Sequence, residues 1–139
     1  MLPSLLLSLG LIATCVLIHY EALRHMNETL PRVSLVNERQ KVLIAIFGAL
    51  GSHLVQITFF ALAFYVLHHT LGLGLIGGRF DDTFATYLYF SAETYTSLGF
   101  GDIYPAGEIR VLSGVEALTG LLMISWSASF SYLEMRRFW

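Results

Sequence analysis

Three long runs without charged side chains constrain this chain more than any other feature. The first, residues 2–20, ends just before Glu21, the first charged residue. The second covers residues 42–67, and the third covers residues 111–133 with only Glu116 inside it. About 20 apolar residues in a helix span the hydrocarbon core of a bilayer. The three runs therefore predict three transmembrane helices.

The overall composition supports a membrane protein and excludes other classes. Only 13% of the 139 residues are charged, whereas soluble domains usually carry about 25%. So few charges cannot cover a water-facing surface, and the hydrophobic content of 55% excludes intrinsic disorder. The net charge of -2 argues against a nucleic-acid partner. The single cysteine, Cys15, can form no internal disulfide.

A secretory signal peptide is the alternative interpretation of residues 2–20. Such a peptide would begin with basic residues and end at a small-residue cleavage site. The segment has neither feature. We therefore interpret it as a first membrane helix.

Basic residues predict how the helices are oriented, because cytoplasmic segments carry an excess of Lys and Arg. Six of the eight basic residues lie between the first two runs or after the third run. The N-terminus is therefore predicted to lie outside and the C-terminus in the cytoplasm, with residues 68–110 facing outward. The six cytoplasmic residues are Arg24, Arg32, Arg39, Lys41, Arg136 and Arg137, and the two outer ones are Arg79 and Arg110.

Residues 81–105 do not have the composition of a plain extracellular loop, because they are rich in large aromatic side chains. Asp81 and Asp82 stand where helix N-caps belong, and no Gly or Pro follows between Thr83 and Tyr95. The pattern predicts a short helix that ends at a Gly-x-Gly turn. Such a helix is too short to cross the membrane, so we expect the segment to enter the membrane and return.

The turn itself, residues 97–102, reads Ser-Leu-Gly-Phe-Gly-Asp. Irregular backbone is tolerated at membrane depth only where protein buries it or a watery path lines it. Glycines at alternate positions permit dihedral angles closed to other residues, so successive carbonyl oxygens can point toward one axis. Rings of such carbonyls can replace the hydration shell of a potassium ion. A glycine-rich turn without a pore is the alternative.

The segment from Phe90 to Pro105 closely resembles the pore helix and selectivity filter of tetrameric potassium channels, whose signature is T-x-G-[YF]-G-D. The resemblance covers about Lys41 to Met135, and the whole chain looks like small bacterial ion channels with one extra N-terminal helix. It implies an all-α membrane fold with three transmembrane helices, a re-entrant pore helix, a filter loop and a homotetrameric pore. The implied parts are an N-terminal transmembrane helix at 1–20, a cytoplasmic connection at 21–40, and a pore domain at 41–139 with its outer helix at 42–67, pore helix at 82–96, filter at 97–102 and inner helix at 108–135.

The resemblance implies that the filter residues bind K+. The carbonyl groups of Ser97, Leu98, Gly99 and Phe100 would supply the rings, within a filter that includes Gly101. Ser97 replaces the usual Thr, so it keeps the hydroxyl and loses a methyl group, and we expect a looser inner site. No cofactor other than K+ ions is implied. The implied partners are further copies of the chain, the lipid bilayer and K+, with no nucleic acid.

Four residues are implied to support the filter: Glu93, Asp102, Tyr89 and Thr96. The two carboxyl groups match a pair that shares a proton or a water molecule behind the filter, and repulsion between them should raise one pKa. Alternatively, Glu93 faces an outer vestibule and attracts cations. Tyr89 could donate its hydroxyl to Asp102. Thr96 lies where the pore helix ends, and the negative end of the helix dipole favours a cation there.

Two positions in the third run carry further hypotheses. Gly120 lies where the family places a hinge glycine, although close helix packing explains it equally well. Glu116 is an ionisable group inside a membrane helix, and such groups usually have a partner. Its depth predicts that it could pair with His53 at mid-membrane. The alternative is that His53 is bonded to backbone or to Gln56.

The function predicted from these observations is a minimal potassium channel of the bacterial inner (plasma) membrane, which conducts K+ passively. We find no catalytic constellation, so an enzyme is not expected. One alternative is a nonselective monovalent cation channel, and another is a non-conducting, pore-like regulatory membrane subunit. Residues 21–40 could lie on the inner membrane surface and couple to the outer helix, or serve as a simple tether.

Overall fold

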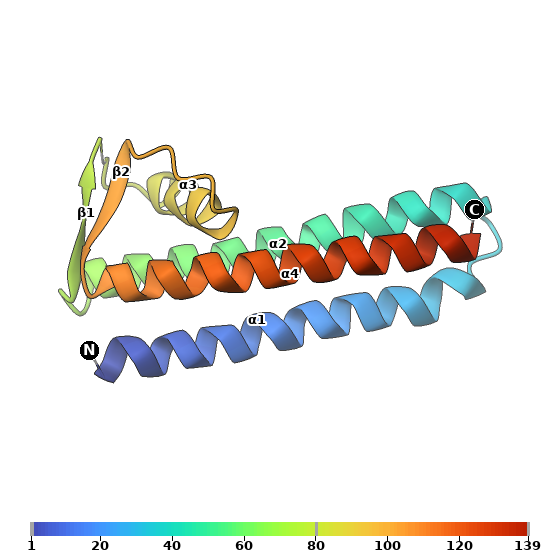
Figure 1. Ribbon diagram of the computed structural model, residues 1–139, viewed down its shortest axis with the longest axis horizontal. Helices are drawn as coiled ribbons and strands as arrows, with labels where there is room; N and C mark the ends of the chain where they lie inside the picture. The colour runs from blue at the N-terminus through green and yellow to red at the C-terminus, as the bar shows by residue number, and fades with distance from the viewer. Residues whose placement is uncertain (1, 80, 139) are drawn as a thin grey trace.

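Three long helices dominate the computed structural model, which describes residues 2–79 and 81–138 (Figure 1). They are α1 (Leu2–Thr29), α2 (Glu38–His69) and α4 (Ile109–Phe138). Within the described residues, these are the helices that are long and apolar enough to cross a membrane, as predicted. They lie side by side with alternating directions, so the two termini lie at opposite ends of the bundle (Figure 1).

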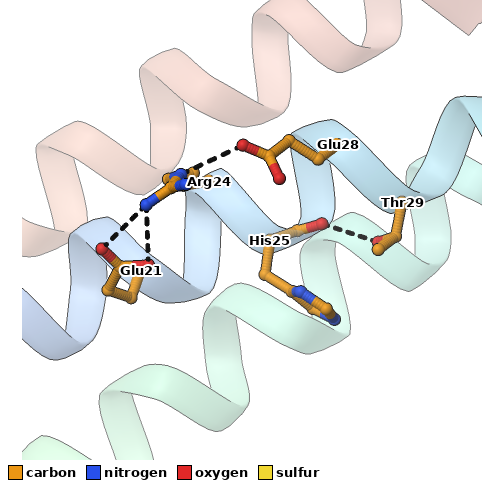
Figure 2. Close-up of polar contacts among 5 residues, drawn as sticks. All are labelled: Glu21, Arg24, His25, Glu28 and Thr29. Carbon is orange, nitrogen blue, oxygen red and sulfur yellow. Dashed lines mark hydrogen bonds and ion pairs between the residues drawn. The ribbon is translucent and has the colours of Figure 1, made fainter.

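The first helix is longer than predicted. It does not end near Tyr20 but continues to Thr29, where a single 3-10 turn, η1 (Leu30–Arg32), follows. Ion pairs stabilise this extension, because Arg24 lies one turn from an acidic residue on each side (Figure 2). Its guanidinium lies 3.3 Å from Glu21 and 3.0 Å from Glu28. Charged residues therefore continue the helix here rather than ending it.

The extension also packs against the bundle. Its apolar side chains Leu23, Met26 and Leu30 are buried together with Phe130 of α4 and two alanines of α2. Near the same end, the Arg137 guanidinium donates a 3.0 Å hydrogen bond to the side-chain oxygen of Asn27. Residues 21–32 are thus helical and part of the bundle, so the first helix extends into the segment 21–40 that was predicted as a connection after the helix at 1–20.

A two-stranded antiparallel sheet lies at the end of the bundle that also holds the N-terminus (Figure 1). Strand β1 (Gly74–Gly78) pairs with β2 (Ile103–Gly107), and Gly74 lies opposite Gly107. The strands approach so closely that a Cβ on Gly74 would lie 2.7 Å from the carbonyl oxygen of Ala106. The glycines therefore permit a strand here.

The short helix α3 (Phe84–Tyr95) lies between the two strands in sequence. It packs against α2 and α4 on the side opposite α1 (Figure 1). Its start and end agree with the predicted pore helix to within two residues. The largest apolar core lies where these helices meet, and its large side chains are Phe60, Phe64, Leu67, Tyr87, Phe90, Tyr95, Ile109 and Leu112.

Candidate functional site

The backbone amides of residues 97–100 all bond to the end of α3. Because these N–H groups are directed toward their own helix, the segment is attached to α3 along one side. The bonds run from Ser97 to the Thr94 carbonyl (3.0 Å), from Leu98 and Gly99 to the Glu93 carbonyl (2.9 and 3.4 Å), and from Phe100 to the Glu93 carboxylate (3.2 Å).

The backbone dihedral φ alternates in sign along the same segment. It is positive at Ser97 (57°), Gly99 (54°) and Gly101 (81°), and negative at the residues between them. In an ordinary strand, successive carbonyls point to opposite sides, so inverting every second residue turns them to the same side. A positive φ at a non-glycine residue such as Ser97 costs about 1–2 kcal/mol. In the described part of the chain, no hydrogen bond ends on a carbonyl oxygen of residues 97–101.

The segment lies on the surface of the single chain. Leu98 is 59% exposed and Phe100 is 66% exposed, although both are large apolar side chains. A Cβ added at Gly99 or Gly101 would meet no atom within 4 Å. A single chain therefore does not enclose this segment, which forms one wall of an open face.

Asp102 ends the segment and is held by Tyr89 of α3. The Tyr89 hydroxyl lies 3.1 and 3.2 Å from the two carboxylate oxygens of Asp102, in the contact predicted from the sequence. The ring of Tyr89 also stacks on Phe100, with 6.4 Å between the ring centroids. The Asp102 carbonyl accepts a 2.9 Å bond from the Arg79 amide. Both the side chain and the backbone carbonyl of Asp102 are therefore held by hydrogen bonds.

The sharing of a proton or a water molecule between Glu93 and Asp102 stays a prediction. Among the described residues, their carboxyl groups do not hydrogen-bond to each other directly. The reason is that each has a donor of its own, the Phe100 amide and the Tyr89 hydroxyl. Burial raises the pKa of Glu93, the Phe100 amide opposes this by stabilising the carboxylate, and the charge of Asp102 raises the pKa further. Glu93 is buried, so it does not face an open vestibule in the single chain.

Comparison with protein families decides what kind of protein carries this segment. A family model described as an ion channel matches residues 40–132, about two thirds of the chain. The chain belongs to the ion channel family. Its match covers α2, α3 and most of α4. Comparisons with curated proteins and with solved structures find no significant match.

The family and the three apolar helices make this channel an integral membrane protein. Family membership also indicates transport rather than an enzymatic role. No group of three or more His, Cys, Asp or Glu side chains in the part of the channel that the structure describes could hold a metal ion.

Glu116 of the channel pairs with Ser91 and not with His53, which corrects the predicted mid-membrane pair. The Ser91 hydroxyl lies 2.5 Å from a Glu116 carboxyl oxygen and 2.8 Å from the Ile57 carbonyl. A carbonyl can only accept, so the single hydroxyl proton of Ser91 goes to Ile57. Glu116 must then donate to Ser91, which requires its carboxyl group to be protonated. The resulting chain of bonds links α4, α3 and α2.

His53 bonds instead to two hydroxyl groups that the sequence reasoning did not single out. Its Nδ1 lies 2.9 Å from the Tyr95 hydroxyl, and its Nε2 lies 2.9 Å from the Ser127 hydroxyl. Neither of the predicted alternatives, backbone or Gln56, is a direct partner. The sequence contains a signal for these contacts, because polar side chains are costly in membrane helices and usually hydrogen-bond to one another.

Two remaining predicted residues are Gly120 of α4, which contacts the end of α3, and Thr96, which caps α3. A Cβ on Gly120 would overlap the carbonyl oxygen of Tyr95, so this glycine lets α4 approach the end of α3 closely. Its role as a hinge stays a prediction. The Thr96 hydroxyl donates a 2.7 Å bond to the Ala92 carbonyl and thereby closes the last turn of α3.

Proposed function

We propose that this channel conducts K+ passively, through a filter formed by residues 97–101 of four identical chains. The proposal rests on one observation, which is that the amides and the carbonyls of the filter backbone differ in their hydrogen bonding. The amides of residues 97–100 bond to their own pore helix, while the carbonyl oxygens of residues 97–101 accept no bond from the described residues. Carbonyl oxygens are the ligands that replace the hydration shell of K+.

Fourfold assembly follows from the same geometry. One chain supplies one strand of carbonyls, and a cage around a K+ ion needs four. The exposed side chains of Leu98 and Phe100 also need apolar cover that the single chain does not supply. Neighbouring copies around a central axis would provide both. In this assembly Glu93, Tyr89, Thr96 and Asp102 act behind the filter and keep its shape.

The proposed setting is the bacterial plasma membrane, with the N-terminus and the filter on the outer side. The excess of basic residues at the opposite end of the bundle supports this orientation. Labelling with a membrane-impermeant maleimide tests it. In a Cys15→Ser background, Gly107→Cys should react from outside intact cells, and Ser34→Cys should react only after permeabilisation.

Ion flux from proteoliposomes tests the function. With K+ inside, Na+ outside and a proton ionophore present, we expect flux carried by K+, blocked by Ba2+ and abolished by Gly99→Ala. The matched control is Gly51→Ala, because Gly51 lies within α2 and a Cβ there would also meet nothing within 4 Å. Gly99, unlike Gly51, has a positive φ, so an added Cβ is strained there even though it has space.

Two results would contradict the proposal. Equal K+ and Na+ fluxes would indicate a nonselective cation channel, consistent with the missing methyl group at Ser97. A monomer or dimer in mild detergent, together with no flux, would indicate a non-conducting regulatory subunit.

A further inference from the structure

A groove opens between α1 and α4, in the half of the bundle toward the C-terminal ends of these two helices. Its volume is about 360 Å³, and its wall is aromatic or aliphatic except at Arg24, Asn27 and Glu134. The ion channel match begins at residue 40, so one wall of the groove, α1, lies outside that match. The filter and its supporting residues do not use this groove.

The wall changes from aromatic to charged along the groove. The two helices run in the same direction (Figure 1), and Tyr20 lies level with Trp126, because their ring centroids are 6.5 Å apart. With a rise of about 1.5 Å per residue, Arg24 lies about 6 Å and Glu134 about 12 Å further toward the C-terminal ends. The order along the groove is therefore aromatic, then basic, then acidic.

Glu134 is buried without a full set of hydrogen-bond partners, since it is only 2% exposed. Its Oε1 lies 3.9 Å from Nη1 of Arg137, beyond hydrogen-bond distance, and that nitrogen donates instead to Asn27 at 3.0 Å. Its Oε2 is buried and receives no hydrogen bond from the described residues. Ionisable groups inside membrane helices usually pair with an opposite charge. Glu134 therefore has room for a cationic donor, and it borders the groove.

Arg24 keeps part of its hydrogen-bonding capacity unused. Its Nε and Nη1 atoms donate to Glu28 and Glu21 (Figure 2). A guanidinium carries five N–H donors, and Nη2 of Arg24 donates no bond within the described part of the chain. The side chain is 51% exposed. Arg24 can therefore bind a phosphate group and still keep both ion pairs.

These features favour one class of ligand over others. A metal ion is not favoured, because no group of three or more His, Cys, Asp or Glu side chains occurs among residues 2–79 and 81–138. A small polar amine would leave the aromatic stretch at Tyr20 and Trp126 uncovered. A ligand that contacts all three stretches has an apolar chain, then a phosphate, then an ammonium group. A phospholipid with an ammonium headgroup presents its groups in this order.

We propose that the groove between α1 and α4 binds phosphatidylethanolamine, a phospholipid with a primary ammonium headgroup. Its ammonium group donates to Glu134, its phosphate accepts from Arg24, and an acyl chain packs along Trp126. The length fits, because the aromatic-to-acidic distance of about 12 Å is close to half of the ~30 Å hydrocarbon core. The bound lipid joins the first helix to α4 at the end of the bundle away from the filter.

Quenching of Trp126 fluorescence by lipids with brominated acyl chains tests this site in the full-length channel, because bromine quenches an indole that it contacts. In a Trp139→Phe background, Trp126 is the one remaining tryptophan. Vesicles that mix a brominated lipid with an unbrominated competitor give the ratio of the two association constants. We expect phosphatidylethanolamine to be preferred about tenfold over phosphatidylglycerol, since a hydrogen bond to a charged group contributes about that factor. Phosphatidylcholine, whose ammonium has no N–H, should lie between them.

Two variants assign the charged contacts. Glu134→Gln should bring the ratio of phosphatidylethanolamine to phosphatidylglycerol close to one. Its control is Glu38→Gln, which removes an exposed carboxylate from the start of α2, outside the groove, and should leave the ratio unchanged. If Glu134→Gln does not insert, Arg24→Gln provides a second test. It should weaken quenching by all three brominated lipids and keep their order, because all three carry the phosphate.

Several results would overturn the proposal. Equal quenching by the three lipids would show that the groove does not distinguish headgroups, and a preference for phosphatidylglycerol would show an anionic-lipid site. No quenching by any brominated lipid would show that a neighbouring chain covers the groove. A tenfold preference that persists in Glu134→Gln would exclude this carboxylate. None of these results depends on K+ flux, so a failure of the channel function would be seen separately in the flux assay.

Discussion

Replacing Gly120 by alanine should push α4 away from the end of α3. The methyl group would overlap the Tyr95 carbonyl oxygen and lie 2.8 Å from its carbonyl carbon. These are backbone atoms at the end of α3, so they cannot rotate aside as a side chain could. Either α4 shifts or the residues that lead into the filter shift.

A second glycine of the same helix isolates the size of this effect. A Cβ on Gly114 would meet nothing within 4 Å. Alanine favours a helix over glycine by about 1 kcal/mol at either position, so that gain cancels between the two variants. Overpacking a close contact costs about 1–3 kcal/mol. Gly120→Ala should therefore be less stable than Gly114→Ala by about 1–3 kcal/mol.

Unfolding by SDS titration in mixed micelles, followed by circular dichroism, measures this difference in free energy. K+ flux should fall in Gly120→Ala and stay at the wild-type level in Gly114→Ala. If Gly120→Ala proves as stable as Gly114→Ala and conducts normally, close packing at Tyr95 does not explain this glycine.

Three further predictions concern single side chains. Tyr89→Phe removes the donor to Asp102, so K+ flux should decay faster with time than in the wild type, and an unchanged time course would contradict a supporting role. Glu116→Gln should keep stability and flux, because an amide can donate to Ser91 as the carboxylic acid does, whereas Glu116→Ala should lose about 1–3 kcal/mol of unfolding free energy in the SDS titration. The Tyr87 hydroxyl and then His69 lower the pKa of Asp82. This carboxylate therefore stabilises the C-terminal end of α2 against the start of α3 above pH ~4, and it ceases to do so as pH falls further. Thermal unfolding of Asp82→Asn against the wild type should therefore differ at neutral pH and converge in acid.

The membrane helices and the irregular turn after α3 could be predicted because they are encoded locally. The run from residue 42 to 67 has no charged side chain, so its length alone predicts a membrane helix. The alternate glycines Gly99 and Gly101 predict the left-handed backbone conformation that they adopt. The Tyr89 contact with Asp102 followed from the family resemblance. In each case the property depends on a few neighbouring residues or on a short motif.

One error concerns local charges, and the other concerns partners that are distant in sequence. Arg24 and its acidic neighbours appeared to end α1, although ion pairs one turn apart extend it to Thr29. His53 was assigned to Glu116 by depth alone, which says nothing of the direction in which a side chain points around its helix. Its partners Tyr95 and Ser127 lie 42 and 74 positions away. Only the packing of four helices decides which polar side chains meet.

The paired strands have a consequence for how this part of the channel could be moved or replaced. Their pairing, extended by the bond from the Arg79 amide to the Asp102 carbonyl, joins the chain where the segment 79–102 leaves the bundle and where it returns. The two ends of this segment thus meet at the paired strands, which we call the neck. The hydrogen bonds of the neck offset the entropy cost of closing the loop, so the filter residues do not have to do so. The segment is thus held at its two ends by the strands and in its middle by the packing of α3 on α2 and α4, and we call it the filter cassette. Exchange with the corresponding cassette of a relative, cut at the neck, should transfer ion preference while leaving the three membrane helices in place.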